Sequence, residues 1–253
     1  MELQHLARPS GHAIAVRHHL KRGDAQTILF LPGYASDMMG SKAVALDALA
    51  DREGLGMLRF DYRGTGESEG RFADFTLEDW LDDAAAVADT AAGPLLLVGS
   101  SMGGWLMLHL AERLGDRVKA IVGIAAAPDF TDWGYTDAEK QALGRDGELR
   151  RDNPYGGDAE LTTLALWQSG ERLRLLDRAV GFAGPVRLLH GDCDAEVPLD
   201  IAARLKDALV SSDVQLTIVK GGTHRLSAPH ELALLERTVM GLAAGVPAPI
   251  WPA

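Results

Sequence analysis

The sequence is poor in cysteine and in positive charge. Its 253 residues include a single cysteine, Cys193, which excludes an internal disulfide and suits a reducing compartment. The 25 basic residues face 36 acidic ones, a net charge of −11, and without a basic stripe or an aromatic platform no nucleic-acid binding is expected. The sequence contains no run of about 18 apolar residues, so no membrane span is predicted. The first residues lack the apolar core of a secretory signal, and these absences together predict a cytoplasmic protein.

Motifs for metals and cofactors are also missing. No Cys/His spacing suits zinc, no His-Glu-x-x-His is present, and there is no Walker loop. Gly64 and Gly66 lack the third glycine and the strand–helix setting of a dinucleotide site. We therefore expect no cofactor and no metal, and we interpret residues 61–68 as structural support beneath a site.

Patterning predicts one α/β domain over residues 1–253. The chain is 47% hydrophobic, and its short apolar runs alternate with helical patterns, which is typical of a mostly parallel sheet flanked by helices. An antiparallel hairpin is expected at one sheet edge, formed by residues 2–7 and 12–20. Further strands are expected at 27–31, 55–60, 95–100, 118–125, 186–190 and 213–219. Helices are expected at 41–52, 76–92, 102–114, 198–210 and 227–244. Thr76 and Asp79 form a candidate capping box for the second helix.

The alternation of strands and helices breaks between residues 128 and 184. This polar stretch is too long for a simple connection between strands. Its periodic pieces, 136–148 and 159–176, are predicted to be helical. We interpret it as a small helical cap inserted over the strand ends, the alternative being two ordinary packing helices.

A nucleophile motif follows the apolar run at residues 95–98. Residues 99–103 read Gly-Ser-Ser-Met-Gly, and a strand that ends in Gly-x-Ser-x-Gly and turns at once into a helix is a nucleophile elbow. The flanking glycines allow backbone to pack on backbone, while the turn presents the Ser101 hydroxyl above the sheet. Ser101 is the candidate nucleophile.

A serine nucleophile needs a base and an acid, which follow it in the order Ser, Asp or Glu, His. The base candidate is His224, in the glycine-rich loop after the last predicted strand. The acid candidates are Asp192, Asp194 and Glu196, in the loop after strand 186–190; Asp194 lies in mid-loop. The alternative is that all three are solvated loop residues or helix caps. The remaining histidines fit strands or helices, and His190, at a strand end, is interpreted as structural.

Attack by a serine creates an oxyanion, which needs two positioned donors. The first candidate is the main-chain N–H of Met102, at a helix N-terminus. The second is the N–H of Tyr34, after the Pro32-Gly33 turn, which read alone is equally an ordinary turn. Candidate substrate walls are Trp105, Met38, Trp133 and Trp167, because apolar side chains near these loops suit an acyl group; for Trp105 a core position is equally expected.

Ordered motifs over nearly the whole chain resemble α/β-hydrolases of the serine esterase and thioesterase type. They are Leu-Pro-Gly-Tyr at 31–34, Phe-Asp-Tyr-x-Gly-x-Gly-x-Ser at 60–68, Gly-Ser-Ser-Met-Gly-Gly-Trp at 99–105, His-Gly-x-x-Asp-x-x-Val-Pro at 190–198, and His224. This resemblance implies the α/β-hydrolase fold and selects Asp194 as the acid. The longer strings at 36–38, 99–109, 187–191 and 224–225 are more narrowly similar to mitochondrial palmitoyl-protein thioesterases that also cleave an acyl glucuronide.

The resemblance implies two-step hydrolysis of a small-molecule ester or acyl thioester, or of an acylated protein, without a cofactor. Ser101 attacks the carbonyl while His224 takes its proton, and the acyl-enzyme then reacts with water. Cleavage of an amide or a C–C bond is the enzymatic alternative. A non-catalytic small-molecule receptor on the same fold is the other alternative, and the complete set of candidate residues disfavours it.

Overall fold

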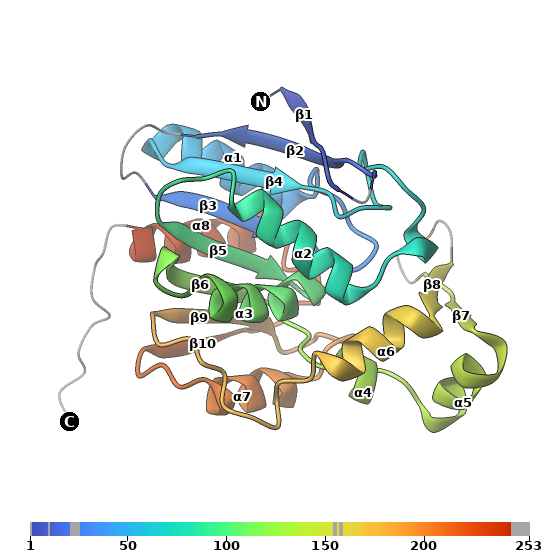
Figure 1. The fold of residues 1–253 in the computed structure, drawn as a ribbon. Helices are drawn as coiled ribbons and strands as arrows, with labels where there is room; N and C mark the ends of the chain where they lie inside the picture. The colour runs from blue at the N-terminus through green and yellow to red at the C-terminus, as the bar shows by residue number, and fades with distance from the viewer. Residues whose placement is uncertain (1, 10, 21–25, 154–155, 157–158, 244–253) are drawn as a thin grey trace.

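The computed structural model describes residues 2–9, 11–20, 26–153, 156 and 159–243 (Figure 1). Its centre is an eight-stranded sheet in the order β1-β2-β4-β3-β5-β6-β9-β10. The strands are β1 (Leu3–Leu6), β2 (Ile14–His19), β3 (Thr27–Leu31), β4 (Gly56–Phe60), β5 (Leu95–Ser100), β6 (Val118–Ile124), β9 (Val186–Gly191) and β10 (Val214–Val219). β1 and β2 pair antiparallel at one edge and β2 pairs antiparallel with β4, while all remaining pairs are parallel. The predicted mostly parallel sheet with an edge hairpin is therefore confirmed.

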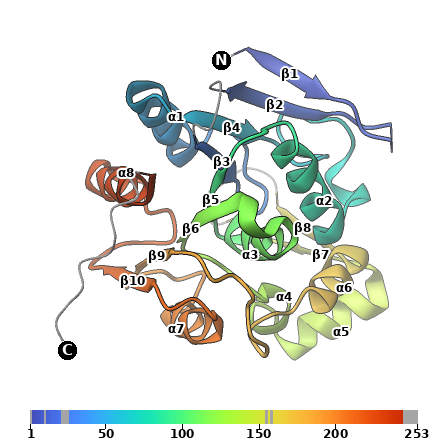
Figure 2. The same ribbon diagram turned by 60° about the vertical axis from the view of Figure 1, so that its left-hand side comes forward.

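Helices cover both faces of the sheet, which explains why its central strands are apolar throughout. One face carries α1 (Ser41–Glu53) and α8 (Pro229–Ala243), and the other carries α2 (Leu77–Ala88), α3 (Met102–Leu114) and α7 (Leu199–Ala208) (Figures 1 and 2). Every residue of β5 is buried. Each face therefore has its own apolar core.

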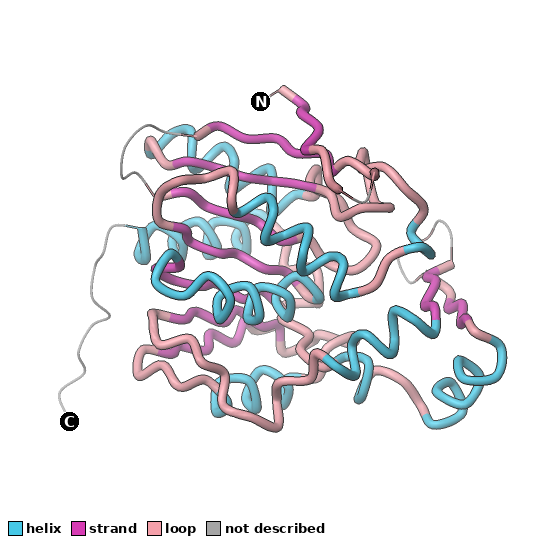
Figure 3. Tube along the Cα trace, viewed as in Figure 1, coloured by secondary structure: helices cyan, strands magenta, loops and turns pink. Residues whose placement is uncertain are grey.

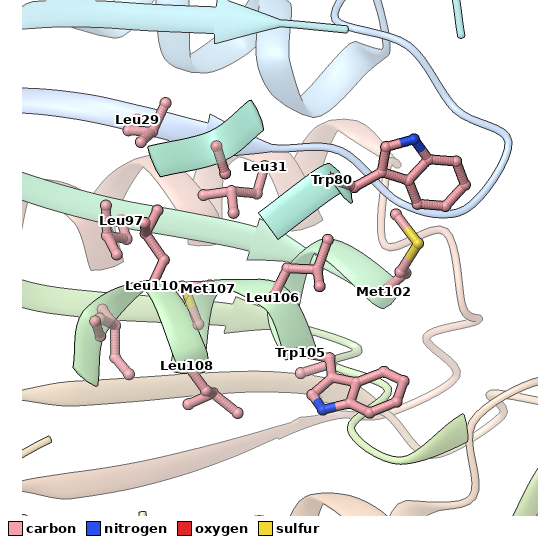
Figure 4. Close-up of a cluster of buried hydrophobic side chains, with 14 of the residues drawn as sticks. Leu29, Leu31, Trp80, Leu97, Met102, Trp105, Leu106, Met107, Leu108 and Leu110 are labelled. Atoms are coloured by element: carbon pink, nitrogen blue, oxygen red, sulfur yellow. The ribbon is translucent and has the colours of Figure 1, made fainter. Parts of the chain in front are cut away.

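The core beneath α3 holds the elbow strand and its helix together. Leu31 of β3 and Leu97 of β5 share a buried cluster with Leu106 and Leu110 of α3 (Figure 4). All four side chains are fully buried. The position of Ser101, between β5 and α3, is thereby fixed by packing on both sides.

The predicted capping box of α2 is present. The Thr76 side chain accepts a hydrogen bond from the Asp79 N–H at 3.3 Å, and the Asp79 carboxylate accepts one from the Thr76 N–H at 2.9 Å. This reciprocal pair satisfies two N–H groups that have no partner within the helix.

Residues between β6 and β9 leave the sheet and gather beyond the carboxyl ends of the parallel strands (Figure 1). We call residues 128–184 the inserted segment. Its elements are α4 (Phe130–Trp133), α5 (Asp137–Asp146), β7 (Glu148–Arg151), β8 (Glu160–Thr163) and α6 (Leu164–Arg172). The region 154–155 and 157–158 of the predicted cap lies outside the described residues.

The secondary structure of the inserted segment differs from the prediction of two helices (Figure 3). The piece predicted as helix 159–176 begins as strand β8, which pairs antiparallel with β7, and becomes helical at Leu164. Thr163 explains the change, because its hydroxyl accepts from the Leu166 N–H and caps α6. The short helix α4 was not expected.

The inserted segment is tied to the body of the molecule at its base. Its own two ends are joined to each other, because the buried Asp129 carboxylate accepts hydrogen bonds from the N–H groups of Leu175 and Leu176, both at 2.9 Å. The Ser169 hydroxyl accepts from the Leu77 N–H at the start of α2, at 3.0 Å. None of the helices in the described ranges has the length and apolar composition needed to cross a bilayer.

Candidate active site

The turn between β5 and α3 presents Ser101 in a strained conformation. Ser101 has φ 53° and ψ −120°, in the region that favours glycine. A Cβ on Gly103 would lie 2.2 Å from the Leu31 carbonyl oxygen, and one on Gly99 would lie 2.4 Å from the Gly103 carbonyl oxygen. Gly103 therefore allows the start of α3 to lie against the end of β3, and Gly99 allows β5 to lie against the start of α3.

Three side chains from distant loops meet at this elbow. His224 Nε2 lies 3.0 Å from Ser101 Oγ, and His224 Nδ1 lies 2.9 Å from Asp194 Oδ2. With Nδ1 protonated toward the carboxylate, Nε2 is free to accept the serine proton. The structure thus brings the predicted nucleophile, base and acid into one hydrogen-bonded line.

Asp194 is held as a carboxylate in a buried position. Its side chain is 1% exposed, and its Oδ1 accepts from the N–H groups of Glu196 and Val197, both at 2.9 Å. Burial raises the pKa of Asp194, but the hydrogen bond and charge of His224 and the two main-chain donors outweigh this, so the pKa lies below its ordinary value. The carboxylate therefore remains charged beside the imidazole.

The other two acids of this loop take different positions from Asp194. Asp192 accepts from the Gly221 N–H at 2.6 Å and so joins the two loops. Glu196 Oε2 lies 3.7 Å from His224 Nε2, on the side that faces the cavity. The buried His190, which was interpreted as structural, has its Nε2 2.9 Å from the Val197 carbonyl oxygen and 3.6 Å from Asp194 Oδ2.

The loops that carry Asp194 and His224 lie against each other through glycines. A Cβ on Gly191 would lie 2.1 Å from the Gly222 carbonyl oxygen. The Cys193 N–H also donates to that oxygen at 2.9 Å. A Cβ on Gly222, in the loop before His224, would in turn lie 3.0 Å from the Val219 carbonyl oxygen and 3.1 Å from the Gly191 Cα, so a side chain would be crowded at either position.

Lys42, which the sequence analysis did not single out, connects α1 to the loop of His224. Its Nζ donates to the main-chain carbonyl of Arg225, the residue after His224. Burial, and then the nearby charge of Arg225, lowers the pKa of Lys42 to about 8, while Glu231 and Glu196 oppose the shift. No sequence pattern marks a lysine in the first turn of a helix for such a contact.

Ser101 and His224 open into a cavity of about 710 Å³. Tyr34 and Met102, the predicted oxyanion residues, line the same cavity, and a Cβ on Gly33 would lie 3.4 Å from the Ser101 Cβ. The cavity has aromatic and charged lining residues. The aromatic ones include Tyr34, Phe130, Trp133 and Tyr135, and the charged ones include Lys42, Arg151, Glu160, Glu196 and Arg225. One cavity can therefore contact both apolar and polar parts of a ligand.

Of the four predicted wall residues, only Trp133 lines this cavity. Met38 and Trp105 are fully buried. The main chain of Met38 is held by hydrogen bonds with the side chains of Asp61 and Arg59. The Trp105 ring packs edge-to-face on Phe130 at 5.4 Å. Trp167 is turned aside, with its Nε1 donating to the Thr131 carbonyl at 2.8 Å.

Phe130, Tyr135 and Arg151 take the places at the cavity that the other tryptophans were expected to fill. They come from the inserted segment, and no sequence motif predicts which residues of that segment reach the cavity.

The loop predicted as structural support has that position. Asp61 accepts hydrogen bonds from the N–H groups of Met38 at 2.6 Å and Glu67 at 2.8 Å. A Cβ on Gly66 would lie 2.1 Å from Asp61 Oδ2, so the glycine is needed for this contact. Across the part of the chain that the structure describes, no cluster of three or more His, Cys, Asp or Glu residues could hold a metal ion.

The sheet order, the elbow after β5 and the line of Ser101, His224 and Asp194 are the arrangement expected of an alpha/beta hydrolase. The chain belongs to the alpha/beta hydrolase family, whose model matches residues 28–234. It is an enzyme of this family.

Among curated proteins it is similar to the mitochondrial palmitoyl-protein thioesterase ABHD10 of Mus musculus, with 36% identity over 86% of this chain and 75% of that protein. The Homo sapiens ABHD10 is 34% identical over 86% of this chain and 73% of that protein.

Solved structures agree with this assignment. The mouse alpha/beta hydrolase domain-containing protein 10 superposes with a TM-score of 0.89 at 33% identity, over 97% of this chain and 100% of that one. A putative hydrolase from Agrobacterium vitis S4 superposes with a TM-score of 0.90 at 35% identity, over 96% and 98% of the two chains. The α/β-hydrolase fold and the resemblance to palmitoyl-protein thioesterases are therefore confirmed.

The expected cytoplasmic location is contradicted. The names of the ABHD10 relatives place those proteins in the mitochondrion. The prediction failed because a single unpaired cysteine indicates a reducing environment without distinguishing one reducing compartment from another.

Proposed function

We propose that this enzyme is a serine hydrolase that cleaves acyl thioesters or carboxylic esters through a Ser101–His224–Asp194 triad. The observation that carries the proposal is the unbroken hydrogen-bonded line from hydroxyl to imidazole to carboxylate at the cavity. Its relatives are named palmitoyl-protein thioesterases, which supports an acyl substrate and includes an acylated protein among the candidates.

The geometry supports the following sequence of steps. Ser101 Oγ attacks the acyl carbonyl while His224 Nε2 takes its proton, and the buried Asp194 carboxylate stabilises the imidazolium. The N–H groups of Tyr34 and Met102 hold the oxyanion. His224 then protonates the leaving thiol or alcohol, and in the second step it activates the water that hydrolyses the acyl-enzyme.

The inserted segment acts as a cap in this proposal, because Trp133 and Arg151 contribute to the cavity wall. The aromatic residues suit the acyl group, and the charged ones suit a polar leaving group. Activated esters such as acyl glucuronides are therefore included among the substrates to be tested.

The first prediction concerns Ser101→Ala, which removes the nucleophile. We expect kcat to fall by about 10⁴–10⁶-fold, as in other triad hydrolases. Wild type and variant are compared on p-nitrophenyl esters, acyl-CoA thioesters, a palmitoyl-cysteine peptide, an acyl glucuronide and aryl amides. A folded variant that hydrolyses these substrates at the wild-type rate contradicts the triad. Wild-type activity on amides alone would favour the amidase alternative.

A further inference from the structure

We infer that the Tyr34 side chain is a positioning residue that couples the β7–β8 hairpin to the oxyanion loop. This inference rests on the proposed function and goes beyond it. Its basis is a hydrogen bond from the Tyr34 hydroxyl to the main-chain carbonyl of Leu161 in β8. One residue thereby joins the loop beside the nucleophile to a strand of the inserted segment.

The ring of Tyr34 is fixed by neighbouring aromatic rings. It packs edge-to-face against Phe72 at 5.3 Å, Phe130 at 5.8 Å and Trp80 at 6.1 Å. Burial raises the pKa of the Tyr34 hydroxyl well above its ordinary value, so the hydroxyl keeps its proton and remains a donor at neutral pH. The Tyr34 ring is therefore held in place by its neighbours, and its hydroxyl remains able to donate the hydrogen bond to Leu161 around neutral pH.

Tyr34 lines the same cavity as Ser101, and the residue before it lies against the nucleophile turn. Tyr34 follows Gly33 directly, and a Cβ on Gly33 would be 3.4 Å from both the Ser100 carbonyl oxygen and the Ser101 Cβ. A displacement of the Tyr34 ring would move this turn and the N–H that we propose as an oxyanion donor. Oxyanion stabilisation depends steeply on donor position, so a small displacement lowers kcat.

The other end of the link faces the ligand. Glu160 and Thr162, on either side of Leu161 in β8, line the cavity together with Arg151 of β7. A substrate that contacts this hairpin orders the strand to which Tyr34 is bonded. Substrate binding at the hairpin is thereby transmitted to the oxyanion loop.

The test is Tyr34→Phe, which removes the hydroxyl and keeps the ring. We expect kcat for p-nitrophenyl acetate to fall about 5- to 50-fold with KM within about twofold, because the change acts on a donor of the transition state. The rate constant for labelling Ser101 with a fluorophosphonate falls by a similar factor, since phosphonylation uses the same donors. Deuterium uptake in peptides covering β7 and β8 rises.

Tyr62→Phe is the matched control. The Tyr62 ring also packs on Trp80, at 5.6 Å, but its buried hydroxyl has no hydrogen-bond partner among the residues that the structure describes. Rates within about twofold of wild type are expected for this variant. Its hairpin exchange is also unchanged.

Two outcomes overturn the inference. The first is a folded Tyr34→Phe protein with wild-type kcat and labelling rate. The second is an equal loss of kcat in Tyr135→Phe, which removes the 2.8 Å bond between Tyr135 and Thr162, because general loosening of β8 would then explain both variants. Either result leaves the triad standing if Ser101→Ala is inactive, so the inference and the proposed function fail separately.

Discussion

At the scale of single residues, the three acids in the loop after β9 differ in position. Asp194 bonds to His224 Nδ1, Asp192 bonds to the Gly221 N–H, and Glu196 faces the cavity with its Oε2 3.7 Å from His224 Nε2. Sequence order alone left these three acids equivalent. The resemblance of residues 190–198 to the family motif selected Asp194, and the main-chain N–H groups of Glu196 and Val197 that bind its Oδ1 are the local contacts that hold it inward.

Asp194→Asn tests this assignment. The amide cannot hold the productive tautomer of His224, and we expect kcat to fall about 10⁴-fold, by analogy with the serine-protease triad. Asp192→Asn is the control, with a loss below about tenfold expected because that residue acts only on the loop. Steady-state kinetics on one p-nitrophenyl ester measures both. A larger loss in Asp192→Asn would move the acid to that position.

Lys42 predicts a pH dependence of stability. Its folded pKa is lowered to about 8, so between about pH 8 and its ordinary value of 10.5 the unfolded chain binds more protons than the folded one. Stability contributed by this group therefore rises with pH across that window. Urea unfolding at pH 7.5, 9 and 10 is compared for wild type and Lys42→Met, and their difference in unfolding free energy is expected to shift in favour of wild type. A difference that is constant with pH contradicts the shift.

At the scale of elements, the packing of the elbow between β5 and α3 depends on glycine at positions where a Cβ would meet backbone. Gly103→Ala would place a Cβ 2.2 Å from the Leu31 carbonyl oxygen, which is backbone and has no room to move. We expect a loss of about 2–4 kcal/mol in unfolding free energy together with lower activity.

Gly144→Ala is the matched control for that change. Gly144 lies within α5, where an added Cβ would have no neighbour within 4 Å among the described residues. A gain of about 0.5–1 kcal/mol is expected from helix propensity. Thermal and denaturant unfolding compare the two variants, and equal effects of both substitutions would contradict the close-packing argument.

The elements also show how far sequence reasoning reaches. The elbow, the capping box of Thr76 and the loop of His224 could be predicted, because each depends on residues close together in the chain. The β7–β8 hairpin could not, since a helix-like pattern at 159–176 is overridden by pairing with β7 and by the cap at Thr163. Trp105 was left undecided because its burial depends on a distant segment: its Nε1 donates to the carbonyl of Leu173 in the inserted segment, which covers this part of α3.

At the scale of the whole molecule, the inserted segment is joined to the helices that cover the sheet. Trp105 Nε1 of α3 donates to the Leu173 carbonyl at 3.2 Å, and the Ser169 hydroxyl of α6 accepts from the Leu77 N–H at the start of α2 at 3.0 Å. Such shared contacts favour cooperative unfolding of the two parts.

We therefore predict one unfolding transition for residues 1–253. Near-UV circular dichroism follows the packing of the aromatic side chains, and hydrogen exchange follows α6 and the sheet separately. The transitions are expected to coincide in urea. Exchange of α6 at a distinctly lower denaturant concentration than the sheet would show instead that the inserted segment unfolds by itself.

The central claim is that the hydroxyl at the turn between β5 and α3 forms the covalent intermediate. Labelling with a fluorophosphonate, followed by mass spectrometry of the digested protein, tests this directly. The account predicts stoichiometric modification of Ser101 in the wild type and none in Ser101→Ala. An unlabelled but folded wild type, or a label on another residue that persists in Ser101→Ala, would contradict it.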